Sequence, residues 1–179
     1  MSRSFMHAIR ASARHSRAIQ STSELLGKLR VESVFVGSVA RAAWLGDEIA
    51  GGSIDALALM NAPQKNQLAM MASHRGYRVE REEIEESELL DLVPLHFEDE
   101  EGEVRVHVLL ASNALYGRMV SGGVAAGDVR VPRAEDLALL LLMAEDHDAV
   151  RRLAALPEFD RAAFDQRLVS IGLAGQVAR

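Results

Sequence analysis

The sequence predicts an α/β (α+β) fold, with a mixed β-sheet of about five strands flanked by helices and a C-terminal helical portion. Three patterns lead to it: an apolar strand that breaks at glycine before a short helix, two β-like segments around an acidic turn, and a helical final quarter. With 179 residues and 49% apolar content, the chain can bury a core. We expect a basic N-terminal helix or arm (1–20), an α/β core (21–132) and a C-terminal helical portion packed on that core (133–179).

Composition narrows the expected partners and compartment. A net charge of −6 argues against broad electrostatic attraction to nucleic acid, so we expect no nucleic-acid partner. The chain has no cysteine and therefore no disulfide or thiolate–zinc site. Its longest apolar run, 137–144, is too short to span a membrane, and the first residues do not resemble a secretory signal. We therefore expect a soluble, cytoplasmic protein with no membrane partner.

The core is predicted to be organised around a strand, a short helix and a second strand. Because two neighbouring strands joined by a helix place their connecting residues at one edge of a sheet, a phosphate-bearing ligand could bind there. The segments are an apolar run at Val34–Val36, a break at Gly37-Ser38, a helix over 39–45, a glycine-rich turn, and a strand over 53–59 that carries Asp55.

The break at Gly37-Ser38 has two explanations. As a binding feature, Gly37 permits close backbone approach, and the helix that follows Ser38 offers unpaired N–H groups and the positive end of its dipole to an anion. As a structural feature, the pair is a tight strand-to-helix turn in which Ser38 caps the helix.

The other expected elements follow from capping, turn and periodicity signals. Ser21, Thr22 and Ser23 are N-cap candidates for a helix that starts at Glu24. The acidic run 82–92 is expected to be a solvated helix or loop. The remaining expected elements are a helix from Pro63 to Gly76, a strand over 77–81, a hairpin of 92–98 and 103–110, a short helix within 112–123, a strand over 128–131, one long helix over 133–156, and a last helix capped by Asp160.

Several blocks, in order, resemble the DNA polymerase β-type nucleotidyltransferase superfamily, and most closely its AbiEii-type toxin nucleotidyltransferases. The resemblance covers about residues 22–155 and implies a nucleotidyltransferase-like fold in a toxin–antitoxin or phage-defence setting. The blocks that carry it are Val36-Gly37-Ser38, Ser53-Ile54-Asp55, the junction Gly76-Tyr77, Val106-His107-Val108, and the helix start Pro132-Arg133-Ala134-Glu135-Asp136-Leu137.

The same resemblance implies where a metal site would lie. In this superfamily, three carboxylates hold two magnesium ions, which need hard oxygen ligands. Asp55 occupies the first carboxylate position, but Leu57 occupies the second and His107 the third, and a position that commonly carries lysine falls at about Leu141. The resemblance therefore implies an eroded site in which Asp55 is the one remaining metal ligand.

Our leading functional hypothesis is a catalytically inactive nucleotide- or partner-binding, regulatory module. Its expected site comprises Asp55 and His107 as residues of the former catalytic centre, with Gly37, Ser38 and Ser53 contacting the nucleotide or another phosphate-bearing ligand. One alternative is an active nucleotidyltransferase that transfers a nucleotidyl group from a nucleoside triphosphate to RNA or protein. In that case Mg²⁺ is the cofactor, and a displaced acid works with Asp55; the candidates are Asp47, Glu48 and Glu103.

Another alternative is a structural assembly subunit. The basic N-terminal helix, with Arg3, Arg10, Arg14 and Arg17, would then bind a protein partner. The simpler possibility is that this helix packs on its own domain.

Histidines offer two further possibilities. Asp55 and His107 are expected to face each other across neighbouring strands, either as an acid–base pair or as a polar pair left from an ancestral site. His96 is expected diagonally across the hairpin from His107, so a zinc site of Asp55, His96 and His107 is possible in principle. Asp146, His147 and Asp148 are consecutive on a predicted helix, so they cannot converge on one ion.

Overall fold

A computed structural model describes residues 6–49, 51–80 and 91–172. It divides into two compact units, one over residues 6–132 and one from residue 133 onward. The predicted acidic run 82–92 lies almost entirely outside the described residues. In the described part of the chain, no helix combines the length and the apolar character that a membrane crossing requires.

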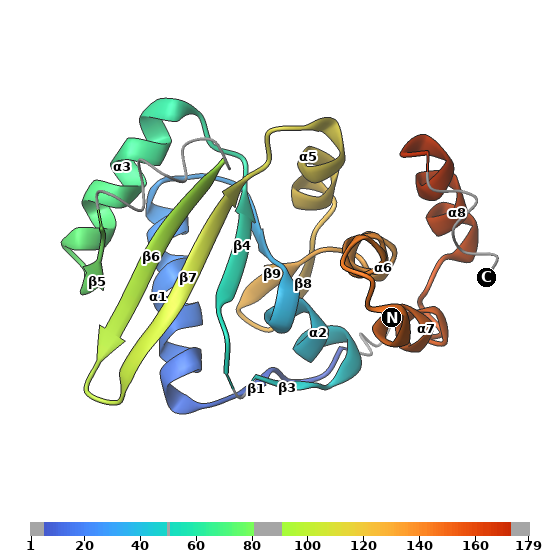
Figure 1. The fold of residues 1–179 in the computed structure, drawn as a ribbon, viewed down its shortest axis with the longest axis horizontal. Helices are drawn as coiled ribbons and strands as arrows, with labels where there is room; N and C mark the ends of the chain where they lie inside the picture. The colour runs from blue at the N-terminus through green and yellow to red at the C-terminus, as the bar shows by residue number, and fades with distance from the viewer. Residues whose placement is uncertain (1–5, 50, 81–90, 173–179) are drawn as a thin grey trace. The chain divides into compact units, whose positions relative to one another are not determined.

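The unit over residues 6–132 is built on a mixed five-stranded sheet with the order β2-β4-β7-β6-β5 (Figure 1). β4 and β7 are parallel, and the other neighbouring pairs are antiparallel. The sheet confirms the predicted α/β fold class. Its strands are β2 (Ser33–Phe35), β4 (Ile54–Ala58), β5 (Tyr77–Arg78), β6 (Leu92–Asp99) and β7 (Gly102–Leu110).

The predicted hairpin is β6 and β7. Their register pairs Asp99 with Gly102 at the turn, as the acidic turn sequence indicated. Along β7, Val104, Val106 and Val108 are at most 2% exposed, whereas the residues between them are exposed or half-buried. This alternation gives the sheet one apolar face and one polar face.

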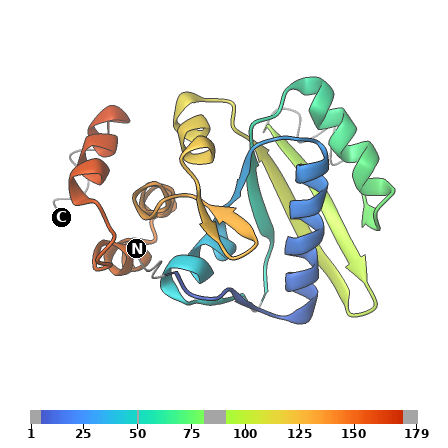
Figure 2. The same ribbon diagram turned by 180° about the vertical axis from the view of Figure 1, so that it is seen from behind.

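Two helices cover the apolar face. α1 (Ala13–Lys28) packs on β7 and β4, and α3 (Ala62–Ser73) lies beside it over β5 and β6; Figure 2 shows α1 in front of the sheet. α3 begins with the capping box of Asn61 and Gln64, so Pro63 lies in its first turn as predicted. Leu25, Leu26 and Leu68 contribute to the core and are at most 1% exposed.

α1 begins earlier than the sequence indicated. Ser12 caps it by accepting a hydrogen bond from the His15 N–H, so the predicted cap at Ser21–Ser23 and the start at Glu24 are wrong. Thr22 is instead completely buried inside the helix, and its Oγ1 lies 2.9 Å from the Tyr77 hydroxyl. A buried partner thus overrides the local preference of serine and threonine for helix ends.

Two short strand pairs and two helices complete this unit. β1 (Arg10–Ala11) pairs in parallel with β3 (Glu48–Ile49). β8 (Val124–Ala126) and β9 (Val129–Val131) form a hairpin, of which we predicted only the second strand. α2 (Gly37–Leu45) follows β2 and anchors the Trp44 indole, whose Nε1–H donates to the Pro132 carbonyl at 2.9 Å. α5 (Ala114–Ser121) begins at the cap Asn113.

The unit from residue 133 onward is helical. It contains α6 (Ala134–Met143), α7 (His147–Ala154) and α8 (Arg161–Ser170). The predicted single helix over 133–156 is wrong, because Glu145 has a positive φ of 60° and Asp146 caps a new helix. α8 is held to α6 by Arg167, whose Nε lies 2.8 Å from an Asp136 carboxylate oxygen, and the predicted cap Asp160 is confirmed.

Charged side chains link the edge strand β5 to the hairpin. Arg78 contacts Glu98 at 2.7 Å and Glu103 at 2.5 Å, and Glu103 also lies 2.9 Å from Nδ1 of His96. Hydrogen bonds from His96 and then Arg78 lower the pKa of Glu103.

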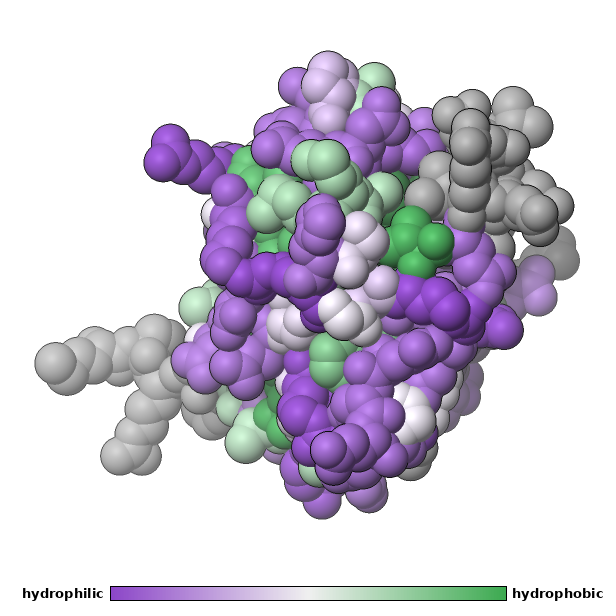
Figure 3. Space-filling view, turned by 90° about the vertical axis from the view of Figure 1, so that its left-hand side faces the viewer, coloured by the Kyte–Doolittle hydropathy of each residue, from purple (hydrophilic) through white to green (hydrophobic). Residues whose placement is uncertain are grey.

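The face on the left of Figure 1, where β5 and α3 lie, is mostly hydrophilic, with small apolar areas (Figure 3). A two-residue strand with a charged side chain protects the sheet edge from pairing with another chain.

We expect Gly123→Ala to lower the free energy of unfolding by about 1–3 kcal/mol, because the new methyl group would overpack the core. A Cβ at this position would lie 2.4 Å from a Val34 methyl carbon, and Val34 is completely buried. Gly27→Ala is the matched control, since its Cβ would meet nothing within 4 Å; it should stabilise α1 by about 0.5–1 kcal/mol. Urea unfolding of the three proteins measures both effects, and equal stabilities would contradict the packing argument.

We expect Glu103→Gln to destabilise the protein at neutral pH by less than about 1 kcal/mol, because the ion pairs of Glu103 are partly exposed. A lowered carboxyl pKa stabilises the folded state above the unfolded pKa, and this contribution is lost as the pH falls through the folded pKa. The difference between wild type and variant should therefore be constant near about pH 6 and shrink below about pH 4. Denaturation series at several pH values measure it. Glu100→Gln, on the exposed turn, should show no such trend.

Candidate functional site

The site centres on the junction between β2 and α2. The chain enters α2 at Gly37, which has a positive φ of 55°. A Cβ at Gly37 would lie 2.9 Å from Oδ2 of Asp55, and the Val36 N–H donates to the Asp55 carbonyl at 2.8 Å. Only glycine combines this conformation with such a close approach. The structure therefore brings Gly37 and Asp55 together, as the predicted strand–helix–strand arrangement required.

α2 begins without a side-chain cap. Its N-cap residue is Val36, and no acidic residue lies in its first turn. Ser38 is not the cap that we considered, since its hydroxyl donates to the Ser53 carbonyl at 3.2 Å. Within the described residues, the first N–H groups of α2 thus lack a side-chain cap, and the positive end of the helix dipole lies at the same place.

Asp55 and His107 form a directly opposed pair. They are register partners on the parallel strands β4 and β7, and Nδ1 of His107 lies 2.9 Å from Oδ1 of Asp55. The predicted contact across neighbouring strands is confirmed. Because an ionised carboxylate can only accept, the His107 Nδ1–H donates, which leaves Nε2 without a hydrogen-bond partner among the described residues. The Ser53 hydroxyl donates to the same Asp55 oxygen at 3.0 Å.

The position at which the sequence resemblance places a second carboxylate lies in apolar packing. Leu57 is 3% exposed and pairs with Leu109 on β7. Its side chain offers no ligand atom, and a carboxylate at this depth would need a partner to offset its lost hydration. Leu141, at the expected lysine position, lies in the other unit, on α6, and is 8% exposed.

The acids that we considered as partners of Asp55 are engaged elsewhere or exposed. Asp47 forms an ion pair with Arg41 at 3.0 Å. Glu103 binds Arg78 and His96, and it lies four residues along β7 from His107, about 13 Å away. Glu48 is exposed on β3. None of them joins Asp55.

The donors that are present do not fit a pair of magnesium ions. One carboxylate with a neighbouring imidazole lacks the hard oxygen ligands that such a centre needs. The zinc site that we considered is not formed either, because Nδ1 of His96 lies 2.9 Å from Glu103. Within residues 6–49, 51–80 and 91–172, no group of three or more histidine, aspartate or glutamate side chains could hold a metal ion.

Arg105 is a further residue near the site that was not among those predicted. It lies on β7 two residues from His107, and therefore on the same face of the sheet. Its side chain is exposed and has no ion pair in the described part of the chain. The alternation of valine and polar residues along β7 was the available signal, since it places Arg105 and His107 together. Arg105 adds a positive charge about two residues along the strand from the Asp55–His107 pair.

The triplet Asp146, His147 and Asp148 does not form a site. Asp146 caps α7 by accepting a hydrogen bond from the Ala149 N–H, and the other two residues are exposed on the helix. Asp146 therefore lies at the helix start and not, as we had predicted, within one helix with His147 and Asp148.

Among the comparisons with known proteins, the one with solved structures gives a match. No protein-family model and no curated protein sequence matches this chain. Among solved structures, the chain is similar to the crystal structure of an antigenic nucleotidyltransferase-like protein from Paracoccidioides brasiliensis. The TM-score is 0.54 and the identity 10%, over 94% of this chain and 91% of that one. Together with the mixed sheet and the Gly37–Asp55 junction, this likeness shows that the chain has a nucleotidyltransferase-like fold.

Proposed function

We propose that this protein is a catalytically inactive, nucleotidyltransferase-like module that binds a nucleotide or another phosphate-bearing ligand without a metal ion. One observation carries the proposal: the Asp55 carboxylate is hydrogen-bonded to His107 and Ser53, while the neighbouring ligand position is the buried Leu57. A carboxylate with these partners and no second acid beside it is a poor support for two-metal chemistry.

The ligand would bind at the start of α2. Its uncapped N–H groups and dipole favour a phosphate, and Gly37 has no side chain to block approach. Asp55 carries a negative charge beside this position, so an anion needs compensating charge. Arg105 supplies it on the same face of the sheet, and its long side chain can reach several ångströms along the strand.

The setting of this binding function is proposed from the sequence resemblance alone. The ordered blocks resemble AbiEii-type toxin nucleotidyltransferases, which favours a regulatory role in a toxin–antitoxin or phage-defence system. A module that keeps the phosphate-binding start of α2 without the metal ligands would bind a nucleotide as a sensor or sequester it, and would not transfer its nucleotidyl group.

Calorimetric titration with ATP, GTP, CTP and UTP tests the binding. We expect at least one nucleotide to bind equally well with magnesium and with EDTA. Arg105→Ala should weaken binding about fivefold, because one charge–phosphate contact at an exposed site is lost. Arg118→Ala, which removes an exposed arginine on α5, is the matched control and should have no effect.

Two glycine variants distinguish a specific effect at the start of α2 from the general effect of strain at a positive φ. Gly37→Ala and Gly76→Ala both place alanine at a positive φ, of 55° and 82°, but only the first meets Asp55. Loss of nucleotide binding in Gly37→Ala alone would support the site. Absence of binding for all four nucleotides in the wild type would contradict the proposal.

A transfer assay distinguishes the module from an active enzyme. We expect no label transfer from α-labelled nucleoside triphosphates to total RNA or protein, with magnesium or manganese, above the background of an Asp55→Ala variant. The reason is the missing second carboxylate at Leu57. Transfer by the wild type that Asp55→Ala abolishes would overturn the proposed inactivity and favour the nucleotidyltransferase alternative.

A further inference from the structure

α1 has two polar sides with different surroundings. On one side, Arg17 binds Asp99 and Glu101 at 2.8 and 3.0 Å, and Arg14 donates to the Glu101 carbonyl at 3.0 Å. Arg10, just before the helix, donates to the Gly46 carbonyl. These arginines of the N-terminal segment thus contact their own unit. The other side of α1 carries no arginine or lysine where it borders a cavity.

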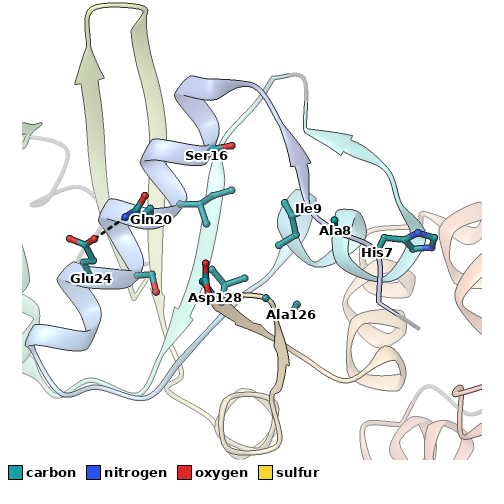
Figure 4. A pocket seen from close by; sticks show the side chains of 12 residues that line it. His7, Ala8, Ile9, Ser16, Gln20, Glu24, Ala126 and Asp128 are labelled. Atoms are coloured by element: carbon teal, nitrogen blue, oxygen red, sulfur yellow. Dashed lines mark hydrogen bonds between the residues drawn. The ribbon is translucent and has the colours of Figure 1, made fainter. Parts of the chain in front are cut away.

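This cavity lies within the unit over residues 6–132 and has a volume of about 600 Å³. Its walls are the segment before β1, one face of α1, and the turn between β8 and β9 (Figure 4). The volume is in the range of small-molecule sites. None of the residues Gly37, Ser38, Ser53, Asp55 and His107 lines it, so it is separate from the proposed phosphate site.

The floor of the cavity is aliphatic. Ile19 of α1 is 6% exposed and Val129 of β9 is 8% exposed, and Ile9 from the segment before β1 completes the apolar lining. Such a surface favours a ligand with a hydrocarbon body, because its apolar area is removed from water on binding.

The charge of the rim is negative. Glu24 and Asp128 come from α1 and from the β8–β9 turn, and Figure 4 shows both beside the cavity, with His7 at the opposite end from Glu24. Gln20 donates to one Glu24 carboxylate oxygen at 3.2 Å, and Arg75 forms an ion pair with the other oxygen at 3.6 Å, which offsets part of its charge. Asp128 is exposed, and within the described residues it has no ion pair.

We propose that this cavity binds a small aliphatic diamine or polyamine. Such a molecule combines the two properties that the walls require: methylene groups that can lie on Ile9, Ile19 and Val129, and separated ammonium groups that can reach Glu24 and Asp128. The hydroxyls of Ser16 and Ser23 add hydrogen-bond acceptors along the same helix face. An anion or an uncharged sugar would leave Asp128 without an ion pair among the described residues.

Calorimetric titration of the full chain with spermidine, 1,4-diaminobutane and butylamine tests the proposal. We expect spermidine and 1,4-diaminobutane to bind with Kd below about 1 mM at low salt, and butylamine at least about tenfold more weakly because it carries one charge. Binding should weaken as the salt concentration rises. Equal affinities for the dication and the monocation, or no binding of spermidine, would overturn the proposal.

Variants locate the binding. Glu24→Gln and Asp128→Asn should each weaken spermidine about threefold to tenfold, since each removes one partly exposed charge. Ser16→Trp, on an exposed position of α1, should block the cavity with the fold unchanged by circular dichroism. Glu100→Gln and Asp148→Asn, exposed acids that do not line the cavity, are the matched controls. If all four acid variants weaken binding equally, the amine is attracted only by the net charge of −6 and the proposal is wrong.

Discussion

The close approach of Gly37 to Asp55 is the constraint on which the functional end of the sheet depends. β2 and β4 are antiparallel neighbours, and α2 starts at the end of β2, directly beside the Asp55 side chain. A side chain at Gly37 would collide with the Asp55 carboxylate and would also be strained by the positive φ. Because this contact joins the strand end, the helix start and the carboxylate, it sets the shape of the corner where a ligand can approach.

A second set of contacts holds the opposite face of the sheet together. α1 joins the hairpin turn through Arg14 and Arg17, and it joins the edge strand through the buried pair of Thr22 and Tyr77. Burial raises the pKa of the Tyr77 hydroxyl, which therefore stays protonated and able to donate. The helix is thereby fixed along its length, which also fixes the wall that it contributes to the acidic cavity.

The polar face of the sheet separates what the backbone register fixes from what the side chains decide. On β4 and β7, the backbone register places positions 55 and 107 opposite each other whatever side chains they carry. With aspartate and histidine there, the two side chains share one hydrogen bond. With leucine at position 57, the neighbouring site becomes part of the apolar packing. Sheet geometry depends on the backbone, whereas metal binding depends on oxygen atoms at particular positions, so the second can be lost without the first.

The sequence by itself determined the features that depend on short-range patterns: the strand–glycine–helix–strand core, the β6–β7 hairpin with its alternating valines, the helix start at Pro63 and the cap Asp160. Their signals are local periodicity, turn residues and side chains that bond a backbone N–H three residues away. The pairing of Asp55 with His107 also followed, because neighbouring strands place their central residues side by side. Only the tertiary structure decided the start of α1, the two-residue pairing of β1 with β3, the break at Glu145, the exposure of Arg105 and the acidic cavity. Some of these features depend on a partner distant in sequence, such as Tyr77 for Thr22 or Glu48 for Arg10. The break at Glu145 depends on a positive φ that no glycine or proline signals.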